Sequence, residues 1–283
     1  METLNVAKPS QNASYDPAAA TAFFESAGVV EKFEADKNFF VEQQKRGFFT
    51  ADDRMFLLVE GSVALSVGGK SLDTIKAGEI FGEMATITNS PRSATATAKT
   101  ACRVISLNGS QFQKAIQKTP RFALMLMGIM IDRLRLTLAR LVMTNALPDG
   151  DSSDMRRVFD DKTLDEIERH LGYPALVRFM PKHKIIQAGE VGVLMYLPRE
   201  GRVAIQSDGH TLEHVGVGGV FGEMALVDRS VRVCDAVAET ECALLAVNRD
   251  QFLTLVKAKP DFGLSLLKVL GLRLKAATRQ RSK

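Results

Sequence analysis

One short stretch of the sequence, FGEMATITNSPRSATAT at 81–97, places a carboxylate and a guanidinium nine residues apart in a mostly apolar setting. Gly82 follows an apolar strand end, and EMATI can form one helical turn directly after it. Backbone N–H groups at a helix start suit a phosphate oxygen, and the planar fork of Arg92 matches two such oxygens. Glu83 would repel a phosphate, so it must accept hydrogen bonds from another group, such as a ribose hydroxyl. The spacing therefore indicates a small ligand with one phosphate charge beside a sugar hydroxyl.

The same stretch recurs 140 residues later as FGEMALVDRSVRVCDAV, with Glu223 and Arg232 at the same spacing. A buried Glu–Arg ion pair that braces the fold is the alternative, because such pairs occur without any binding role. The recurrence of both residues at one spacing favours a binding site over a brace.

The repeat extends well beyond this stretch. A shift of 140 residues overlays Met55 to about Leu134 on the second half without a gap. Upstream the shift becomes 146, so that Phe33 matches Phe179, and the first copy carries about six extra residues in the loop QQKRGFFTADD. Two copies are too few for a solenoid, so the sequence predicts a tandem pair of globular domains.

Within each copy the hydrophobic pattern changes once. From about Phe39 to Leu107 apolar residues alternate or form short runs broken by glycine, which predicts an antiparallel, jelly-roll-like β-roll. After Asn108 the spacing becomes helical, and Pro120 should start a long helix from Arg121 to about Met143. The matching helix of the second copy runs from Asp261 to about Gln280. The predicted fold class is mainly β with flanking α helices: two tandem β-rolls, each with a C-terminal helix.

The segment TNALPDGDSSD from Thr144 is rich in the residues of turns and connectors, which places the domain boundary near Asp149. We expect a loosely ordered N-terminus over residues 1–18, a first domain over 19–148 and a second domain over 149–283. The stretch MRRVFDDKTLDEIERHLG, just after the boundary, is typical of a helical lead-in to the second roll.

Composition limits the class of protein. The 283 residues suffice for two cores, and 46% hydrophobic with 25% charged residues are typical of a soluble globular protein. The longest apolar run, FALMLMGIMI from Phe122, is too short to cross a bilayer, and the N-terminus lacks a secretory signal pattern. We expect a cytoplasmic protein whose three cysteines are buried, reduced thiols, namely Cys102, Cys234 and Cys242.

The motif F-G-E, an apolar and a small residue, then P-R-S-A at this distance closely resembles the phosphate-binding cassette of the cyclic nucleotide-binding domain family. That family includes the catabolite activators, the regulatory subunits of cyclic-AMP-dependent protein kinase and cyclic nucleotide-gated channels. The resemblance covers both copies, most of the chain beyond residue 25. It implies that cyclic AMP, or else cyclic GMP, is the regulatory ligand. Ser93 favours cyclic AMP over cyclic GMP, because relatives that prefer cyclic GMP tend to carry threonine after the arginine.

Carried over residue by residue, the resemblance gives the ribose 2′-hydroxyl to Glu83 and Glu223, and the cyclic phosphate to Arg92 and Arg232. The implied binding residues of the first copy are Gly82, Glu83, Met84, Ala85, Arg92, Ser93, Ala94 and the purine-facing Thr137. Those of the second copy are Gly222, Glu223, Met224, Ala225, Arg232 and Val233, with Thr278 or Ala277 at the purine.

The second copy departs from the pattern at four positions. Val231 replaces the proline, Val233 replaces the serine, Cys234 replaces Ala94, and Asp235 adds a carboxylate near the pocket. Loss of one hydrogen bond together with a nearby negative charge predicts a second site that is roughly tenfold to thirtyfold weaker than the first. If Asp235 points outward on its strand, the two sites are equal.

Other kinds of site find less support. His210 and His214 share a face of a predicted strand, but no third ligand is nearby in the sequence, which argues against a metal. No nucleophile is paired with a base, so the sequence indicates a protein that is not an enzyme. The helix-turn-helix of the catabolite activators has no counterpart after the first long helix, because the second roll occupies that place. The basic end RLKAATRQRSK is better explained by the helix dipole than by DNA binding.

We therefore expect a cyclic nucleotide sensor that signals through helix movement to an unidentified effector protein, without a membrane or DNA as partner. A homo-oligomer is left open. The alternatives are a structural or assembly protein that keeps the fold and has lost the ligand, and a regulatory subunit of an enzyme.

Overall fold

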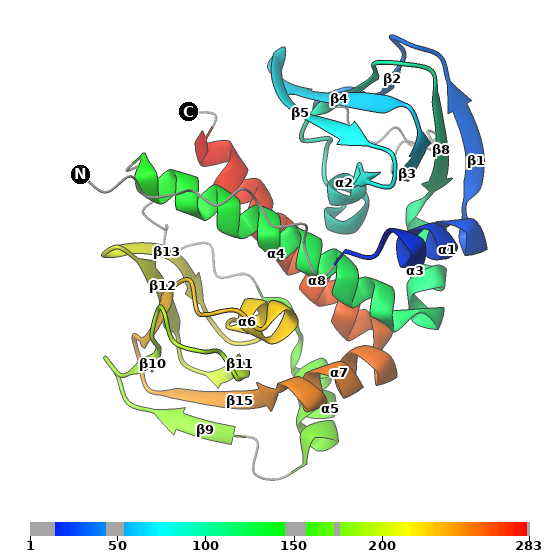
Figure 1. The fold of residues 1–283 in the computed structure, drawn as a ribbon. Coiled ribbons are helices and arrows are strands. Elements are labelled where there is room, and N and C mark those ends of the chain that lie inside the picture. The colour runs from blue at the N-terminus through cyan, green and yellow to red at the C-terminus, as the bar shows by residue number, and fades with distance from the viewer. Residues whose placement is uncertain (1–14, 44–53, 145–156, 173–175, 282–283) are drawn as a thin grey trace. The chain divides into compact units, whose positions relative to one another are not determined.

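The computed structural model describes residues 15–43, 54–144, 157–172 and 176–281 (Figure 1). The chain divides into two compact units, Met1–Ile129 and Met130–Lys283. The division falls inside the long helix α4, Pro120–Met143. The domain boundary that the sequence predicts near Asp149 lies outside the described residues, and so does most of the loop QQKRGFFTADD.

The first unit is an antiparallel roll, as the alternating pattern predicts. Its strands form two four-stranded sheets in the orders β1-β8-β3-β6 and β2-β7-β4-β5. The strands are β1 Val29–Phe33, β2 Asn38–Phe40, β3 Met55–Glu60, β4 Ser62–Val67, β5 Lys70–Lys76, β6 Ile80–Phe81, β7 Thr95–Ala98 and β8 Cys102–Leu107. The short helix α2, Glu83–Thr88, lies between β6 and β7. The core between the sheets combines the aromatic side chains of Phe40, Phe56 and Phe81 with smaller apolar ones.

A helix that the sequence analysis missed precedes this roll. Residues 15–18 were expected to be loosely ordered, but Asp16 caps the helix α1, Pro17–Ala27, by accepting from the backbone N–H groups of Ala18 and Ala19. A capping Asp followed by proline at the first position is a favourable helix start. Phe23 anchors α1, because its ring stacks on that of Phe122 with centroids 3.5 Å apart.

The second unit repeats the roll with two sheets, β10-β14-β12-β13 and β11-β15-β9. Its strands are β9 Leu176–Phe179, β10 Lys184–Ile186, β11 Leu194–Glu200, β12 Val203–Ser207, β13 His210–Val215, β14 Asp235–Ala238 and β15 Cys242–Asn248. The helix α6, Glu223–Asp228, corresponds to α2. The predicted lead-in helix is shorter than expected: α5 is Asp161–Leu171, with Asp160 as its cap. The residue before this cap, Phe159, is buried and stacks on Phe262.

The helices that follow each roll begin where the sequence predicts. Asn108 and Asn248 form capping boxes at α3, Gly109–Lys118, and α7, Arg249–Ala258. The long helices α4 and α8, Pro260–Arg281, begin at matching prolines. In the described part of the chain, none of the helices combines the length and the apolar character that crossing a bilayer requires. Of the three cysteines, Cys102 and Cys242 are buried as expected and Cys234 is half-buried.

Candidate functional site

In each copy the candidate site begins with a glycine whose backbone lies in the left-handed region. Gly82 has a φ of 74° and Gly222 a φ of 80°, and each is the residue directly before α2 or α6. A Cβ added to either glycine would lie 3.1 Å and 3.0 Å, respectively, from Nη1 of the arginine of its own copy. Glycine is therefore needed both for the backbone conformation and for the close approach of the guanidinium.

The arginine of the first copy is almost completely enclosed. Arg92 is 4% exposed and donates from Nη1 to the carbonyl oxygen of Gly82 and from Nη2 to that of Arg54, each at 2.9 Å. The ring of Phe40 lies under the guanidinium, 4.1 Å from its central carbon. The strand β7 begins only at Thr95, three residues after Arg92. The arginine therefore projects from the irregular segment before that strand.

The arginine of the second copy has the same two anchors. Arg232 donates from Nη1 to the carbonyl oxygen of Gly222 at 2.7 Å and from Nη2 to that of Leu194, which matches Arg54 in the repeat. The position of Phe40 is taken by Ile186, so no aromatic ring lies there. Burial lowers the pKa of Arg232, while Tyr196 and Glu223 oppose that effect.

The glutamates are buried at the start of the short helices. Glu83 is 3% exposed and Glu223 is 2% exposed. Oε1 of Glu223 accepts from Nη1 of Arg273 on α8 at 2.8 Å. Glu223 therefore pairs with an arginine of the long helix and not with the arginine of its own cassette.

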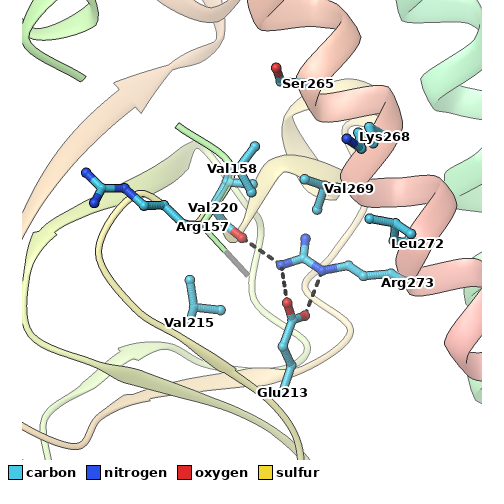
Figure 2. Close-up of a pocket in the computed structure, with 11 residues that line it drawn as sticks. Arg157, Val158, Glu213, Val215, Val220, Ser265, Lys268, Val269, Leu272 and Arg273 are labelled. Atoms are coloured by element: carbon cyan, nitrogen blue, oxygen red, sulfur yellow. Dashed lines mark hydrogen bonds and ion pairs between the residues drawn. The ribbon is translucent and has the colours of Figure 1, made fainter. Parts of the chain in front are cut away.

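Arg273 is the residue that the sequence analysis overlooked. It also donates to Glu213 on β13, at 2.7 Å from Nε, and to the carbonyl oxygen of Val220 at 2.7 Å (Figure 2). Burial alone would lower its pKa, but the two carboxylates outweigh burial and raise it. The signal was available, since Arg273 repeats Arg133 of the first copy.

A cavity of about 140 Å³ lies beside this cluster, between α8 and the roll (Figure 2). Its walls combine aliphatic and charged side chains, and Arg273 with Glu213 forms one side of it. The apolar side chains that line it are Val158, Val215, Val220, Val269 and Leu272. The long helix therefore reaches Glu223 through Arg273 and leaves unfilled space next to it.

The remaining residues of the two cassettes lie around these anchors. Gly192, which the sequence analysis did not identify, packs so closely that an added Cβ would lie 2.3 Å from that of Ala225 and 2.8 Å from the central carbon of Arg232. Ala85 and Ala94 are buried and Ser93 is exposed. The side chains of Met84, Met224 and Val233 are half-buried.

Asp235 is engaged by two groups that lie outside the cassette. Its Oδ1 accepts from the backbone N–H of Ala188 at 2.7 Å and its Oδ2 from Nζ of Lys184 at 2.8 Å. The hydrogen bond from Lys184 holds the pKa of Asp235 below its usual value. In the first copy Thr95 occupies the matching position, and its hydroxyl accepts from the backbone N–H of Glu42 at 2.9 Å. The carboxylate is engaged with the preceding loop and paired with a cation, so the repulsion expected at the phosphate is not supported.

The purine contacts remain predictions. The hydroxyl of Thr137 donates to the carbonyl oxygen of Arg133 one turn earlier in α4, at 2.8 Å. Ala277 is buried on α8, and the side chain of Thr278 lies outside the described residues.

One member of the histidine pair, His214, makes a local contact with a carboxylate. Nδ1 of His214 lies 2.9 Å from Oε2 of Glu239. Across the described ranges, no three His, Cys, Asp or Glu side chains gather as a metal site would require.

A family model described as the cyclic nucleotide-binding domain matches this chain twice, over residues 48–119 and 176–259. The two matches together cover more than half of the chain. Each match contains one of the cassettes described above.

Curated relatives carry the same type of region. A cAMP-dependent protein kinase regulatory subunit of Schizosaccharomyces pombe is 26% identical over 231 residues, which are 80% of this chain and 50% of that protein. A cGMP-dependent protein kinase of Caenorhabditis elegans is 26% identical over 223 residues, 75% of this chain and 26% of the kinase. The cyclic AMP receptor protein of Thermus thermophilus is 34% identical over 106 residues, 35% of this chain and 49% of that protein. The chain thus spans half or less of each of these relatives.

Among solved structures, the catabolite activator protein of Thermus thermophilus is 29% identical and has a TM-score of 0.40, covering 45% of this chain and 62% of that one. The regulatory subunit of a cAMP-independent protein kinase A from Trypanosoma brucei is 20% identical with a TM-score of 0.31, covering 83% and 80%. At these TM-scores the superpositions carry no argument.

Proposed function

Because the chain belongs to the cyclic nucleotide-binding domain family, we propose that it is a non-enzymatic sensor of cyclic AMP, and more weakly of cyclic GMP. In this proposal the bound nucleotide rearranges the long helices, and the rearrangement is transmitted to a partner protein. No metal takes part.

The arginine of the second copy carries the proposal. Arg232 is half-buried and donates to two neutral carbonyl groups. Among the described residues no carboxylate lies within ion-pair distance of it, and Glu223 is paired with Arg273 instead. A guanidinium held in a fixed plane by neutral partners keeps its charge for an anion, and two carbonyl bonds use only part of its five N–H donors. A brace made by the cassette's own Glu–Arg pair does not account for this arrangement.

The pairing of Glu223 supports the ribose half of the site. A carboxylate has about four acceptor positions, so one bond from Arg273 leaves capacity for a ribose hydroxyl. A ligand hydroxyl at Glu223 would then share the carboxylate with Arg273 of α8. Binding at the cassette would thereby act on the long helix, which is the element expected to carry the signal.

Calorimetry with cyclic AMP, cyclic GMP, 2′-deoxy cyclic AMP and linear 5′-AMP tests the sensor proposal. We expect cyclic AMP to bind most tightly, and a concentration about a hundred times its Kd to stabilise the fold by about 2.7 kcal/mol. Glu83→Ala in the first site should weaken binding and remove discrimination against the 2′-deoxy nucleotide. Absence of binding by either cyclic nucleotide at millimolar concentration, with the protein folded, would favour the assembly protein instead.

Amide hydrogen exchange over residues 133–144 tests the proposed helix movement. We expect the protection of this part of α4 to change when cyclic AMP saturates the protein. Equal exchange with and without ligand would show that binding does not move this helix.

A regulatory subunit of an enzyme is a second candidate, which the alignment with kinase regulatory subunits over most of this chain favours. The purified chain can be added to the catalytic subunit of a cAMP-dependent protein kinase. Inhibition that cyclic AMP relieves would support this candidate. Kinase activity that is unchanged at micromolar concentrations of the chain would count against this enzyme as the partner.

A further inference from the structure

The helix α4 has its two halves in different compact units. It is unbroken from Pro120 to Met143, and the division between the units falls between Ile129 and Met130. Its first turn is fixed in the first unit by Phe122, which stacks on Phe23. An unbroken helix of this kind carries a displacement of one end to the other end, because it moves as a rigid rod over a few turns.

The second half of α4 hydrogen-bonds the phosphate-binding segment of the second copy. Arg135 donates from Nη1 to the carbonyl oxygen of Val231 at 3.2 Å and from Nη2 to the hydroxyl of Ser230. Ser230 in turn donates to the same carbonyl oxygen at 3.3 Å. All of these residues belong to the second unit, and Val231 directly precedes Arg232 in the chain.

The positive charge of Arg135 also acts on the thiol of Cys234, further along this segment. Burial raises the pKa of the Cys234 thiol to about 11, and the positive charges of Arg273 and Arg135 offset part of that increase. Arg135 therefore brings a second guanidinium to the stretch from which Arg232 projects.

The same segment is held from its other side by backbone bonds. The N–H of Arg232 donates to the carbonyl oxygen of Glu190 at 2.8 Å, and the N–H of Gly189 donates to that of Arg232 at 2.9 Å. Residues 230–232 thus lie between a loop of the second roll and a side chain of α4. Any movement of α4 that draws Arg135 away releases one of these two supports.

We propose that Arg135 is a positioning residue for the second phosphate-binding segment, through which occupancy of the first site alters the affinity of the second. The proposal rests on the proposed nucleotide binding. It assigns to a helix of the first copy a role in a site whose other identified residues all belong to the second copy.

The test compares Arg135→Gln and Arg135→Lys with Arg140→Gln, which removes an exposed positive charge from the same helix. Calorimetry with cyclic AMP gives the second-site affinity with the first site filled, and the added substitution Arg92→Leu gives it with the first site empty. In the parent protein we expect these two affinities to differ at least fivefold. In Arg135→Gln the ratio should approach one, in Arg135→Lys it should be intermediate, and in Arg140→Gln it should stay at the parent value.

Two further measurements separate coupling from stability and from the proposed function. The melting temperature of Arg135→Gln should match that of Arg140→Gln, and amide exchange of Gly189 and Arg232 without ligand should rise only in Arg135→Gln. A ratio that Arg135→Gln leaves unchanged, or a parent ratio of one, overturns the proposal while nucleotide binding stands. If no variant and no parent protein binds cyclic AMP, the proposed function fails, and this proposal fails with it.

Discussion

The two cassettes hold their arginines with the same pair of carbonyl groups but support them differently. In the first copy Pro91 stiffens the approach to Arg92, and Phe40 lies under its guanidinium. In the second copy the matching residues are Val231, which is half exposed, and the aliphatic Ile186. The repeat has kept the hydrogen bonds that orient the charge, while the packing around that charge has diverged.

The contacts support some of the expected differences in affinity between the two sites and not others. The expected penalty from Asp235 is not supported, because its carboxylate is paired with Lys184 and bonded to the loop. The missing hydroxyl at Val233 and the missing ring remain, at about 1 kcal/mol each. We therefore still expect the first site to be tighter, by roughly thirtyfold.

The largest effect should come from the arginines themselves. Arg92→Leu and Arg232→Leu each remove a charge-assisted contact of about 1.5–3 kcal/mol, so cyclic AMP affinity at the altered site should fall about tenfold to a hundredfold or more. Each variant leaves one intact site to titrate. If the protein with only the second site binds as tightly as the protein with only the first, the expected order of the two affinities is wrong. Circular dichroism checks that both variants remain folded.

Removal of the aromatic ring under Arg92 should have the next largest effect on affinity. Phe40→Leu takes away a cation–π contact of about 0.5–2 kcal/mol and should weaken the first site by about twofold to thirtyfold in titrations of an Arg232→Leu background. Ile186→Leu is the matched control in an Arg92→Leu background and should leave the second site within twofold. Equal effects of the two substitutions would mean that the ring serves only the core.

A gain of binding should follow from restoring the hydroxyl. Val233→Ser offers a neutral hydrogen bond of about 1 kcal/mol and should tighten the second site about fivefold in an Arg92→Leu background. The reverse change, Ser93→Val, should weaken the first site by a similar factor when Arg232 is replaced by Leu. A second site that is indifferent to Val233→Ser would locate the phosphate away from this residue.

The smallest effect on binding is expected at Asp235. Asp235→Asn should change second-site affinity by less than twofold, because the carboxylate faces Lys184 and the loop. Its cost should appear in stability, at up to about 1 kcal/mol near neutral pH. The folded-state pKa of Asp235 is lowered, so its contribution is full above the unfolded pKa of about 4 and disappears as the pH falls through the folded value. Denaturant unfolding of both proteins from pH 2 to 7 should show the curves converging at low pH. A tighter second site in Asp235→Asn would restore the repulsion argument.

Local signals account for the parts of the fold that the sequence predicted. The alternation in SVALSV, the capping pair of Asn108 with Gln111, and the prolines at 120 and 260 each act within a few residues. The helix α1 had an equally local signal, in Asp16 and Pro17, but its aromatic partner Phe122 lies about a hundred residues away. A short helix of low polarity is stabilised mainly by such packing, which is why it was missed.

Of the residues at the candidate site, the sequence likewise predicted some and missed others. Spacing predicted the glutamates and the arginines as site residues, since the proposed chemistry depends on their side chains. The anchors of the guanidinium groups are backbone carbonyls of Arg54 and Leu194, 38 residues upstream, where the side chain gives no indication of the role. Arg273 was visible as a repeated residue, but only the packing of α8 shows that it reaches Glu223.

The division of α4 between two compact units also bears on how the protein is made. Residues up to Ile129 are synthesised well before the second roll, and domains generally fold in the order in which they leave the ribosome. The half of α4 from Met130 onward packs with chain that does not yet exist at that moment, and short helices without partners are marginal in water. When the first copy leaves the ribosome, the second half of α4 is therefore not yet stabilised by packing. It becomes stable only once the second roll has been completed.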